Sequence, residues 1–554
     1  MLFPAVWDYI VVGGGIAGSV ISSRLLEQNP ALRILLIEAG PDVSNRTDIV
    51  YINSTNTVMG DFDYNYQTVP QANLVNRIIP NPAGRALGGG SVINQGGWTR
   101  GSSLDYDLWA ETVGDQRWSY AGQLPYFRKT EDYCDDSNPE HQGSGGPVHV
   151  DSITCTGRHY PLREKVLESW HENGVESIPD LDGNVGRILG VGELYESRRD
   201  GKREIASSVY SLEGVTVLTE TLVESVTSTK GEDGEVQATG VGLANGTEYQ
   251  AKRVVVSAGA YRSPQVLMLS GIGPARTLAK HGIEQVVDLP DVGQNLADHM
   301  MLLLQWRLKD PSLGYAYGSD NPLFSEPPYD SGNPNDFVTT TVVPKEEGQE
   351  AQYPGTCSSA QSDSQLADME NYISYSAVPS DDPPIAVDGT HLSTSLASLH
   401  PTSRGSVTIS SRDASVHPVI DPNYLSTVAD RRVWWESLRR LTLVMVGNAT
   451  ALGRDVVDSE TPPSAFVARP LSPKSAQDDA YLDARITADA HSIYHGQGTC
   501  AMGKVVDTSL RVRGVRGLYV ADASVFPVVI GAHLQAAVYG LAEQAAVIIA
   551  ADDQ

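Results

Sequence analysis

An α/β fold with more than one lobe is predicted by two features of the sequence. A strand, a glycine-rich turn, a helix and a second strand follow one another near the N-terminus and form one βαβ unit. The chain also has 554 residues, of which 41% are hydrophobic. It is therefore too long for one small domain and has enough apolar material for a large core.

Hydrophobic periodicity supports each element in order. Residues 8–12 are predicted to be a buried strand because Tyr9–Val12 are continuously apolar. Residues 19–28 carry apolar side chains at helical spacing, and residues 33–37 contain a second apolar run. Residues 310–382 are rich in Pro, Ser, Asp and Gly and are expected to be the least ordered region, an insertion or a lid. The same patterns predict further strands at 215–218, 223–228, 239–243, 253–257, 406–410 and 517–520, and helices at 118–132, 161–173, 264–269, 431–444 and 533–551.

Three glycines and Glu38 lie in the βαβ unit at the spacing typical of a dinucleotide-binding site. Gly13 permits the tight turn, Gly15 lets backbone approach a pyrophosphate, and Gly18 allows the helix to pack closely on the strand. Glu38 ends the second strand, where a carboxylate can accept hydrogen bonds from ribose hydroxyls. The helix N-terminus supplies N–H donors for phosphate. The unit is therefore predicted to bind a dinucleotide.

The charge of the chain excludes some partners. Lys and Arg number 40 and Asp and Glu 68, so the net charge is −28. Nucleic acid and anionic membranes would be repelled. No apolar run reaches about 18 residues, so no transmembrane helix is expected. The first residues show no secretory signal, which favours a cytoplasmic protein, or a secreted one if a leader has been removed.

The four cysteines fit neither a metal knuckle nor a CxxC redox motif. Free thiols are the expected state, and a disulfide between Cys134 and Cys155 is the alternative. No metal site is predicted. Cys500 is expected to be a buried, inert thiol.

Several further blocks combine glycine with Ser, Asn, Asp and His. Together they resemble, in order and over essentially the whole chain, the glucose–methanol–choline (GMC) family of flavoprotein oxidoreductases. The matching blocks are Gly84–Gly101, Gly259–Pro274, Leu399–Val407, Asp421–Tyr424, His495–Gly503 and Val520–His533, and Gly293–His299 is a further block of similar composition.

This resemblance implies a Rossmann-like FAD-binding domain and a discontinuous substrate-binding domain built on an antiparallel sheet. The FAD-binding domain would comprise residues 1–150, 202–305 and 485–554, and the substrate-binding domain residues 151–201 and 306–484. Some relatives attach FAD covalently through a His just before the Asn that corresponds to Asn94. That position holds Ile93 here, so non-covalent FAD is predicted.

The resemblance also assigns cofactor contacts. The residues expected to hold the ADP part, the ribityl chain or the isoalloxazine ring are Gly13, Gly15, Gly18, Glu38, Ser91, Asn94, Gln95, Gly96, Val223, Asp522 and Ala523.

Two histidines of the matched motifs are expected to be catalytic. Neutral imidazole has a pKa near operating pH, about 6.5, and can remove a hydroxyl proton. We therefore predict His495 as the base and His533 as the residue that hydrogen-bonds and orients the alkoxide. Trp98, Tyr494 and Phe526 are predicted pocket walls, with a place in the hydrophobic core as the alternative for each. Other histidines are expected to be surface or structural residues, namely His159, His299 and His417.

The predicted reaction is oxidation of a small-molecule alcohol, primary or aryl and including intermediates of secondary metabolism, with hydride transfer to flavin and reoxidation by dioxygen. Two alternatives stay open. One is a dehydrogenase that passes electrons to a quinone-type acceptor, and the other is a flavin-containing lyase such as a hydroxynitrile lyase. The sequence predicts no oligomeric state.

Overall fold

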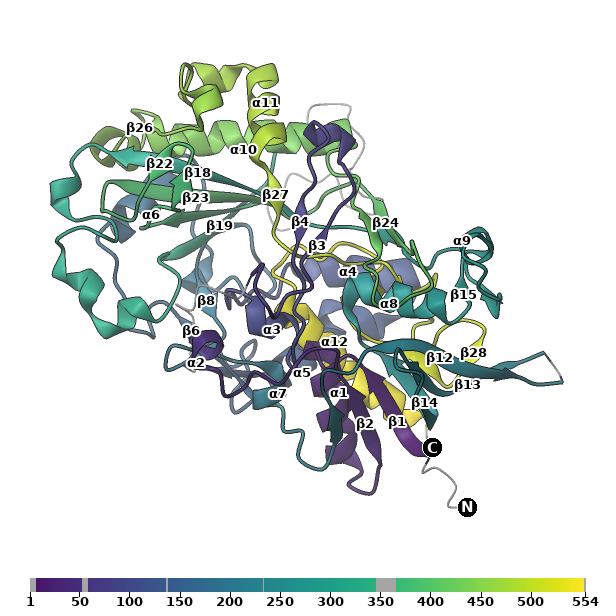
Figure 1. Cartoon of the computed structure of the whole chain (residues 1–554). Helices are drawn as coiled ribbons and strands as arrows, with labels where there is room; N and C mark the ends of the chain where they lie inside the picture. The colour runs from purple at the N-terminus through teal and green to yellow at the C-terminus, as the bar shows by residue number, and fades with distance from the viewer. Residues whose placement is uncertain (1–5, 52–57, 136–137, 233, 345–364, 553–554) are drawn as a thin grey trace.

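The computed structural model of the chain describes residues 6–51, 58–135, 138–232, 234–344 and 365–552. Two large β-sheets organise it, one in the lower right of Figure 1 and one in the upper left. Both lobes contain segments from distant parts of the chain. The α/β class predicted from the sequence is confirmed.

The first sheet is mixed. β1 (Trp7–Val12) lies parallel to β2 (Ile34–Ile37) and to β14 (Glu248–Val256). Its inner residues are buried and continuously apolar, as strands of a parallel sheet with both faces covered must be. The remaining strands are β11 (Thr216–Leu218), β12 (Val223–Lys230), β13 (Val236–Leu243), β28 (Val515–Arg516) and β29 (Leu518–Val520).

Helices cover this sheet and meet at the centre of the molecule. α1 (Ile16–Gln28) and α5 (Tyr120–Thr130) both pack against α12 (Gln535–Ala551). α12 is apolar around almost its whole circumference, and such a helix is stable only when it is buried. It runs through the middle of Figure 1 in yellow. α8 (Gly259–Leu269) follows β14, as its apolar spacing predicts.

The second sheet is antiparallel, as predicted. α10 (Val428–Val446) packs against β23 (His391–Ser398) and β26 (Val457–Glu460), and lies along the outer edge in Figure 1. Thr427 caps this helix by accepting the Asp430 N–H. The strands, in spatial order, are β26 (Val457–Glu460), β18 (Met300–Leu308), β23 (His391–Ser398), β20 (Met369–Ser374), β19 (Phe337–Thr341) and β7 (Gly190–Glu193), with β27 (His491–Ser492) also paired to β18.

The expectation of irregular structure over residues 310–382 was wrong for its two long strands. β19 and β20 are inner strands of the second sheet. Nearly all their residues are buried although many are Thr, Ser, Asn or Glu, so neither strand shows the alternation that marks a half-exposed strand. Residues 345–364 lie outside the described residues. The predicted domain boundary at 305/306 falls within β18, and the other boundaries stay predictions.

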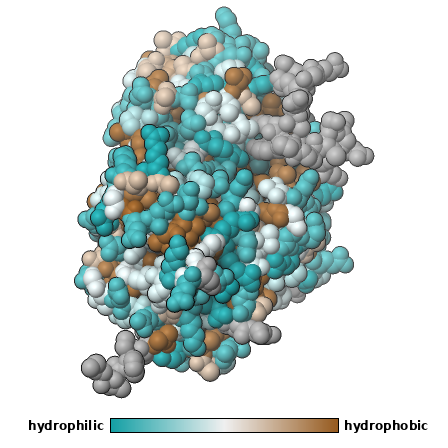
Figure 2. Space-filling model, turned by 90° about the vertical axis from the view of Figure 1, so that its right-hand side faces the viewer, coloured by the Kyte–Doolittle hydropathy of each residue, from teal (hydrophilic) through white to brown (hydrophobic). Residues whose placement is uncertain are grey.

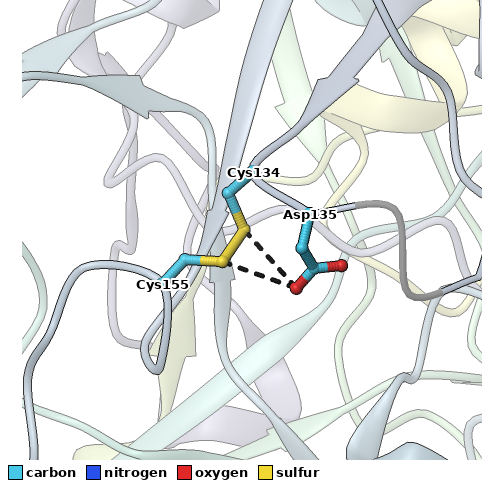
Figure 3. A group of neighbouring side chains, drawn as sticks. All are labelled: Cys134, Asp135 and Cys155. Carbon is cyan, nitrogen blue, oxygen red and sulfur yellow. Dashed lines mark hydrogen bonds between the residues drawn. A yellow bond between two sulfur atoms is a disulfide. The ribbon is translucent and has the colours of Figure 1, made fainter.

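The expectation of free thiols was wrong for one pair, because Cys134 and Cys155 form a disulfide (Figure 3). β5 (Glu131–Tyr133) pairs with β6 (Val148–Ser152), and this pairing brings the two cysteines together. The Asp135 carboxylate lies beside both sulfurs. Cys500 is buried and free, as predicted, and Cys357 lies outside the described residues.

Hydrophilic residues cover most of the face in Figure 2, and hydrophobic ones form small groups near the middle of the view. Within the described ranges, no helix combines the length and the apolar character needed to cross a bilayer.

Candidate active site

A cavity of about 820 Å³ extends from the glycine turn after β1 to the face of the antiparallel sheet. This volume is within the range of sites for cofactors and small molecules. Its lining joins Gly13, Gly15 and Glu38 at one end with His495 and His533 at the other. The predicted nucleotide-binding turn and the predicted catalytic pair therefore face one continuous space.

The glycines at the first end differ in what surrounds them. At Gly13, with φ +100°, a Cβ would lie 2.5 Å from the Ser257 carbonyl oxygen, and at Gly18 it would lie 1.9 Å from that of Gly13. A Cβ at Gly15 would meet only Gly89 Cα, at 3.8 Å. Gly13 and Gly18 are therefore required by packing, whereas Gly15 faces space. No side chain caps the start of α1, so its first N–H groups are available to an anion.

The two acids at this end, Glu38 and Asp522, accept hydrogen bonds from backbone N–H groups. Glu38 accepts the N–H groups of Gly14 and Gly40 at 2.9 and 2.8 Å. Burial raises the pKa of Glu38 to about 7 and outweighs these bonds, which lower it. Asp522 accepts from Gly259 N–H, at 2.9 Å, and from Ser263. Asp522 thus fixes the turn before α8. Val223 and Ala523 line the cavity, as the predicted contacts require.

The segment Asn94–Gly97 lines the middle of the cavity. The Asn94 side chain accepts the Gly96 N–H at 3.1 Å and donates to Gln535 at 3.0 Å, which ties this segment to the start of α12. Ser91 does not line the cavity. Its hydroxyl donates to the Gly88 carbonyl at 2.7 Å and accepts the Ala206 N–H at 2.9 Å.

His495 lies in an irregular stretch between two backbone contacts. Ile493 donates to the His299 carbonyl at 3.0 Å, and Gln497 pairs with Ala297. The chain from Ile493 to Gln497 is longer than the facing chain, so it bulges, as strands near active sites often do. Tyr494 has φ +69° in this bulge.

Asp298 holds the bulge in place. Its buried carboxylate accepts the His495 N–H at 2.9 Å, the Ser492 hydroxyl at 2.6 Å and the Tyr424 hydroxyl. Burial raises the pKa of Asp298 to about 6, and these hydrogen bonds oppose that rise.

The Nδ1 atoms of His495 and His299 lie 2.9 Å apart. Burial holds the pKa of His495 well below its ordinary value, and the neighbouring His533 and His299 lower it further. Burial likewise lowers the pKa of His299 to about 3. Both rings are therefore neutral at physiological pH, and a neutral imidazole is the form that accepts a proton.

His533 has the opposite electrostatic environment. Its Nε2 lies 2.8 Å from a Glu370 carboxylate oxygen and 2.8 Å from the Tyr372 hydroxyl, both presented by β20. Burial disfavours the charged ring, but Glu370 outweighs it and raises the pKa of His533. The ring centroids of His533 and His495 are 5.0 Å apart. The site thus pairs a neutral imidazole with one that favours its cationic form.

The predicted pocket walls lie in different places. Tyr494 lines the cavity and is 40% exposed. Trp98 and Phe526 are completely buried in the core of the first lobe and are absent from the lining. The Trp98 indole N–H donates to Glu131, and Phe526 packs edge-on against Trp109. Their large apolar rings are used for packing.

Three residues of this site were not predicted. His299 was expected to be structural, although it lies in the block Gly293–His299 that the sequence singles out. Glu370 and Tyr372 lie in the stretch that was expected to be irregular. No motif marks them, because they reach His533 only through the pairing of β20 with β23 and β19.

These residues fit the FAD that the sequence resemblance implies. The open side of Gly15 and the uncapped start of α1 suit a pyrophosphate. Among the described residues, the N–H groups of Gln95 and Gly97 meet no acceptor, although both residues line the cavity. Backbone donors left free around a cavity suit a ligand that carries ring acceptors.

Comparisons with known proteins agree with this geometry. The profiles of the GMC oxidoreductase family match residues 7–301 and 401–542. The GMC-type oxidoreductase acuG of Aspergillus aculeatus is 38% identical, with 98% of each chain covered. Versicolorin B synthase stcN of Emericella nidulans is 31% identical, covering 98% of this chain and 89% of its own. The crystal structure of pyridoxine 4-oxidase from Mesorbium loti superposes with a TM-score of 0.81, at 27% identity and 98% coverage of both chains. The chain therefore belongs to the GMC oxidoreductases, a family of FAD-dependent oxidoreductases.

Proposed function

We propose that the chain oxidises a primary or aryl alcohol to the aldehyde or ketone, with His495 as the base. The observation that carries this proposal is the neutral His495 ring at the cavity, 5.0 Å between centroids from the cation-favouring His533. Removal of a hydroxyl proton needs a neutral base, and a nearby cation stabilises the alkoxide that results.

Non-covalently bound FAD would supply the two-electron acceptor for the carbon-bound hydride. Gly15 and the start of α1 would hold its pyrophosphate, Glu38 its ribose, Val223 its adenine, and Asn94–Gly97 its flavin ring. Ile93 offers no nucleophile for a covalent link.

His495 needs its Nε2 lone pair free if it is to take the hydroxyl proton. In that arrangement its Nδ1–H donates to His299 Nδ1, which fixes the tautomer. His533 keeps its proton through Glu370 and presents positive charge to the substrate oxygen. Asp298 keeps His495 in position through the backbone.

An anaerobic screen for bleaching of the flavin absorbance tests the proposal. The probes are benzyl alcohol, 4-methoxybenzyl alcohol, pyridoxine and ethanol, and the His495→Ala variant is the control. Bleaching by at least one alcohol, lost in His495→Ala, supports the proposal. One peroxide released per turnover in air would show dioxygen as the acceptor, and peroxide-free turnover with a quinone would show a dehydrogenase.

A second candidate is acid–base chemistry without net oxidation. A neutral and a cationic imidazole can exchange protons with a substrate without electron transfer, and a relative at 31% identity is named a synthase. Conversion of a substrate that leaves the flavin oxidised under anaerobic conditions would favour this candidate over the alcohol oxidase.

A further inference from the structure

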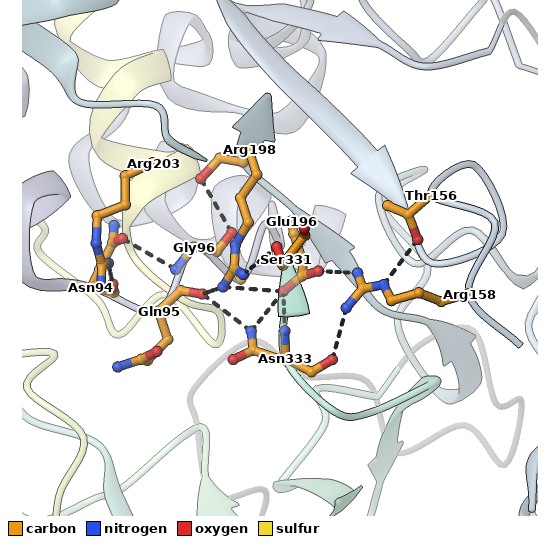
Figure 4. A network of polar contacts seen from close by, with 12 residues as sticks. Asn94, Gln95, Gly96, Thr156, Arg158, Glu196, Arg198, Arg203, Ser331 and Asn333 are labelled. Carbon is orange, nitrogen blue, oxygen red and sulfur yellow. Dashed lines mark hydrogen bonds and ion pairs between the residues drawn. The ribbon is translucent and has the colours of Figure 1, made fainter. Parts of the chain in front are cut away.

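Two buried arginines lie directly behind the segment Asn94–Gly97 (Figure 4). Arg198 and Arg203 are only 3% and 6% exposed. Arg203 donates to the Asn94 carbonyl, and Arg198 donates to the Gln95 carbonyl at 2.5 Å. Neither arginine lines the cavity itself. Both therefore act on the segment from the side opposite to the cavity.

The carbonyls of Asn94, Gln95 and Gly96 accept hydrogen bonds from residues behind the segment, whereas the Gly97 carbonyl accepts from Gln535 at the cavity. The Gly96 carbonyl accepts the Ser197 N–H at 2.7 Å, and Asn333 adds a second donor to the Gln95 carbonyl at 3.1 Å. In a trans peptide the carbonyl and the next N–H point in opposite directions. The N–H groups of Gln95 and Gly97 are consequently directed toward the cavity.

The charge behind the segment is not balanced. Arg158, Arg198 and Arg203 bring three guanidinium groups, and Glu196 is the carboxylate that pairs with Arg158 and Arg198. Burial would raise the pKa of Glu196, but Arg198 and Arg158 lower it, so it is ionised. Burial lowers the pKa of Arg203 to about 10, and the Arg198 charge contributes, yet the group stays protonated at neutral pH.

Burying this excess of positive charge lowers the stability of the folded protein, so packing alone does not explain why arginines stand here. Arg198 Nε and Arg203 Nη2 are buried and have no hydrogen-bond partner among the described residues. Unpaired buried donors are unfavourable, and a hydrophobic side chain of similar size would avoid them. A fixed positive field in a water-poor region is, however, a way to stabilise charge that develops on a neighbouring ligand.

We propose that Arg198 and Arg203 form a cationic clamp that raises the reduction potential of FAD at this site. The clamp would hold the Gln95 and Gly97 N–H groups toward the isoalloxazine ring and place positive charge near it. This ring gains negative charge on reduction, so both effects would favour the reduced form. The two arginines are positioning residues, because they reach the ring through the backbone of residues 94–97. The inference rests on the FAD binding included in the proposed function.

The test compares midpoint potentials of the FAD-loaded protein by equilibration with a reference dye. Arg203→Gln and Arg198→Gln are each expected to make reduction about tenfold less favourable, which is about 30 mV for two electrons. Arg203→Lys should keep most of the potential because it keeps the charge. Arg199→Gln is the matched control, since Arg199 is adjacent in sequence but its side chain is 51% exposed and screened by solvent.

The proposal would be overturned if both Gln variants bind FAD and keep the wild-type midpoint potential. It would also be overturned if Arg199→Gln lowers the midpoint potential as much as they do. If the Gln variants do not fold, Asn333→Asp carries the test. Asn333 donates to the same Gln95 carbonyl and also lines the cavity, so a carboxylate there should oppose the positive field and lower the potential. An unchanged potential in this variant counts against the clamp. Dye reduction needs no alcohol, so the clamp can be judged even if no alcohol bleaches the flavin.

Discussion

His299 and His495 face each other through Nδ1 atoms 2.9 Å apart, so one ring must donate the proton that the other accepts. If His495 donates, its Nε2 is the free lone pair. Burial lowers the pKa of both rings, and two uncharged rings agree with such a shared proton. His299 thereby becomes the residue that selects the reactive tautomer of the predicted base.

Replacing His299 is therefore expected to slow flavin reduction without removing the base. We expect His299→Ala to lower the anaerobic reduction rate about 10- to 100-fold, as loss of an orienting partner does in other sites. His495→Ala should lower it further, about 100- to 10,000-fold. Stopped-flow absorbance with the best alcohol of the screen measures both.

His159→Ala is the control for these two variants, because the His159 side chain is exposed and pairs with Glu164 on the surface. Its reduction rate should equal that of the wild type. A His299→Ala rate equal to the wild type would remove His299 from the catalytic arrangement.

Glu370 is expected to set the alkaline limit of activity through His533. With Glu370 present, the pKa of His533 is raised, so the imidazolium persists to higher pH and is lost as pH rises through that value. Glu370→Gln removes the raising charge. The alkaline limb of the kcat/KM profile should then move to lower pH.

Glu370→Asp keeps the charge and should leave the alkaline limb closer to that of the wild type. The acid limb depends on His495, whose pKa is already low, and should not move toward neutral pH in either variant. A Glu370→Gln profile with an unshifted alkaline limb contradicts the assignment.

Substitutions at the glycines of the turn after β1 should affect FAD binding and folding stability separately. Gly15→Ala has room for its Cβ and an extended backbone, so the melting temperature should stay near that of the wild type. FAD affinity should fall at least about tenfold, since the methyl group occupies the phosphate side. FAD titration by fluorescence quenching and a thermal melt measure the two effects.

Gly18→Ala is the matched variant with the opposite expectation. Its Cβ would lie 1.9 Å from the Gly13 carbonyl oxygen, so α1 must shift away from β1. We expect destabilisation of about 1 to 3 kcal/mol. Equal stability of the two variants would show that the glycines do not divide their roles in this way.

The disulfide should stabilise the folded protein because it lowers the conformational entropy of the denatured chain. Cys134 and Cys155 are 21 residues apart, and closing a loop of this size stabilises by about 3 kcal/mol in the chain-entropy treatment. Cys134→Ser/Cys155→Ser should therefore lower the denaturant midpoint. Dithiothreitol should lower the wild-type midpoint to the same value and leave the variant unchanged, whereas an insensitive wild type would indicate that the bond is not formed.

Much of the first lobe was predictable, because its signals are local. The β1–α1–β2 unit shows its periodicity and its glycines within one continuous stretch, and α10 and α12 carry long helical patterns. β19 and β20 were missed since buried strands with many hydroxyl side chains do not alternate. Trp98 and Phe526 were misplaced because a large apolar ring suits a core and a pocket wall equally well in a sequence.

The sequence by itself determined the family, and it predicted a role for the glycine turn after β1 and for the two histidines of the matched motifs, since each lies in a short block whose spacing carries the chemistry. Only the tertiary structure decided which residues control those histidines. His299 reaches His495 through the pairing of β18 with β27, and Glu370 reaches His533 across the interface of the two lobes. The protonation of each ring depends on burial and on charges distant in sequence, and these distances exist only after the chain has folded.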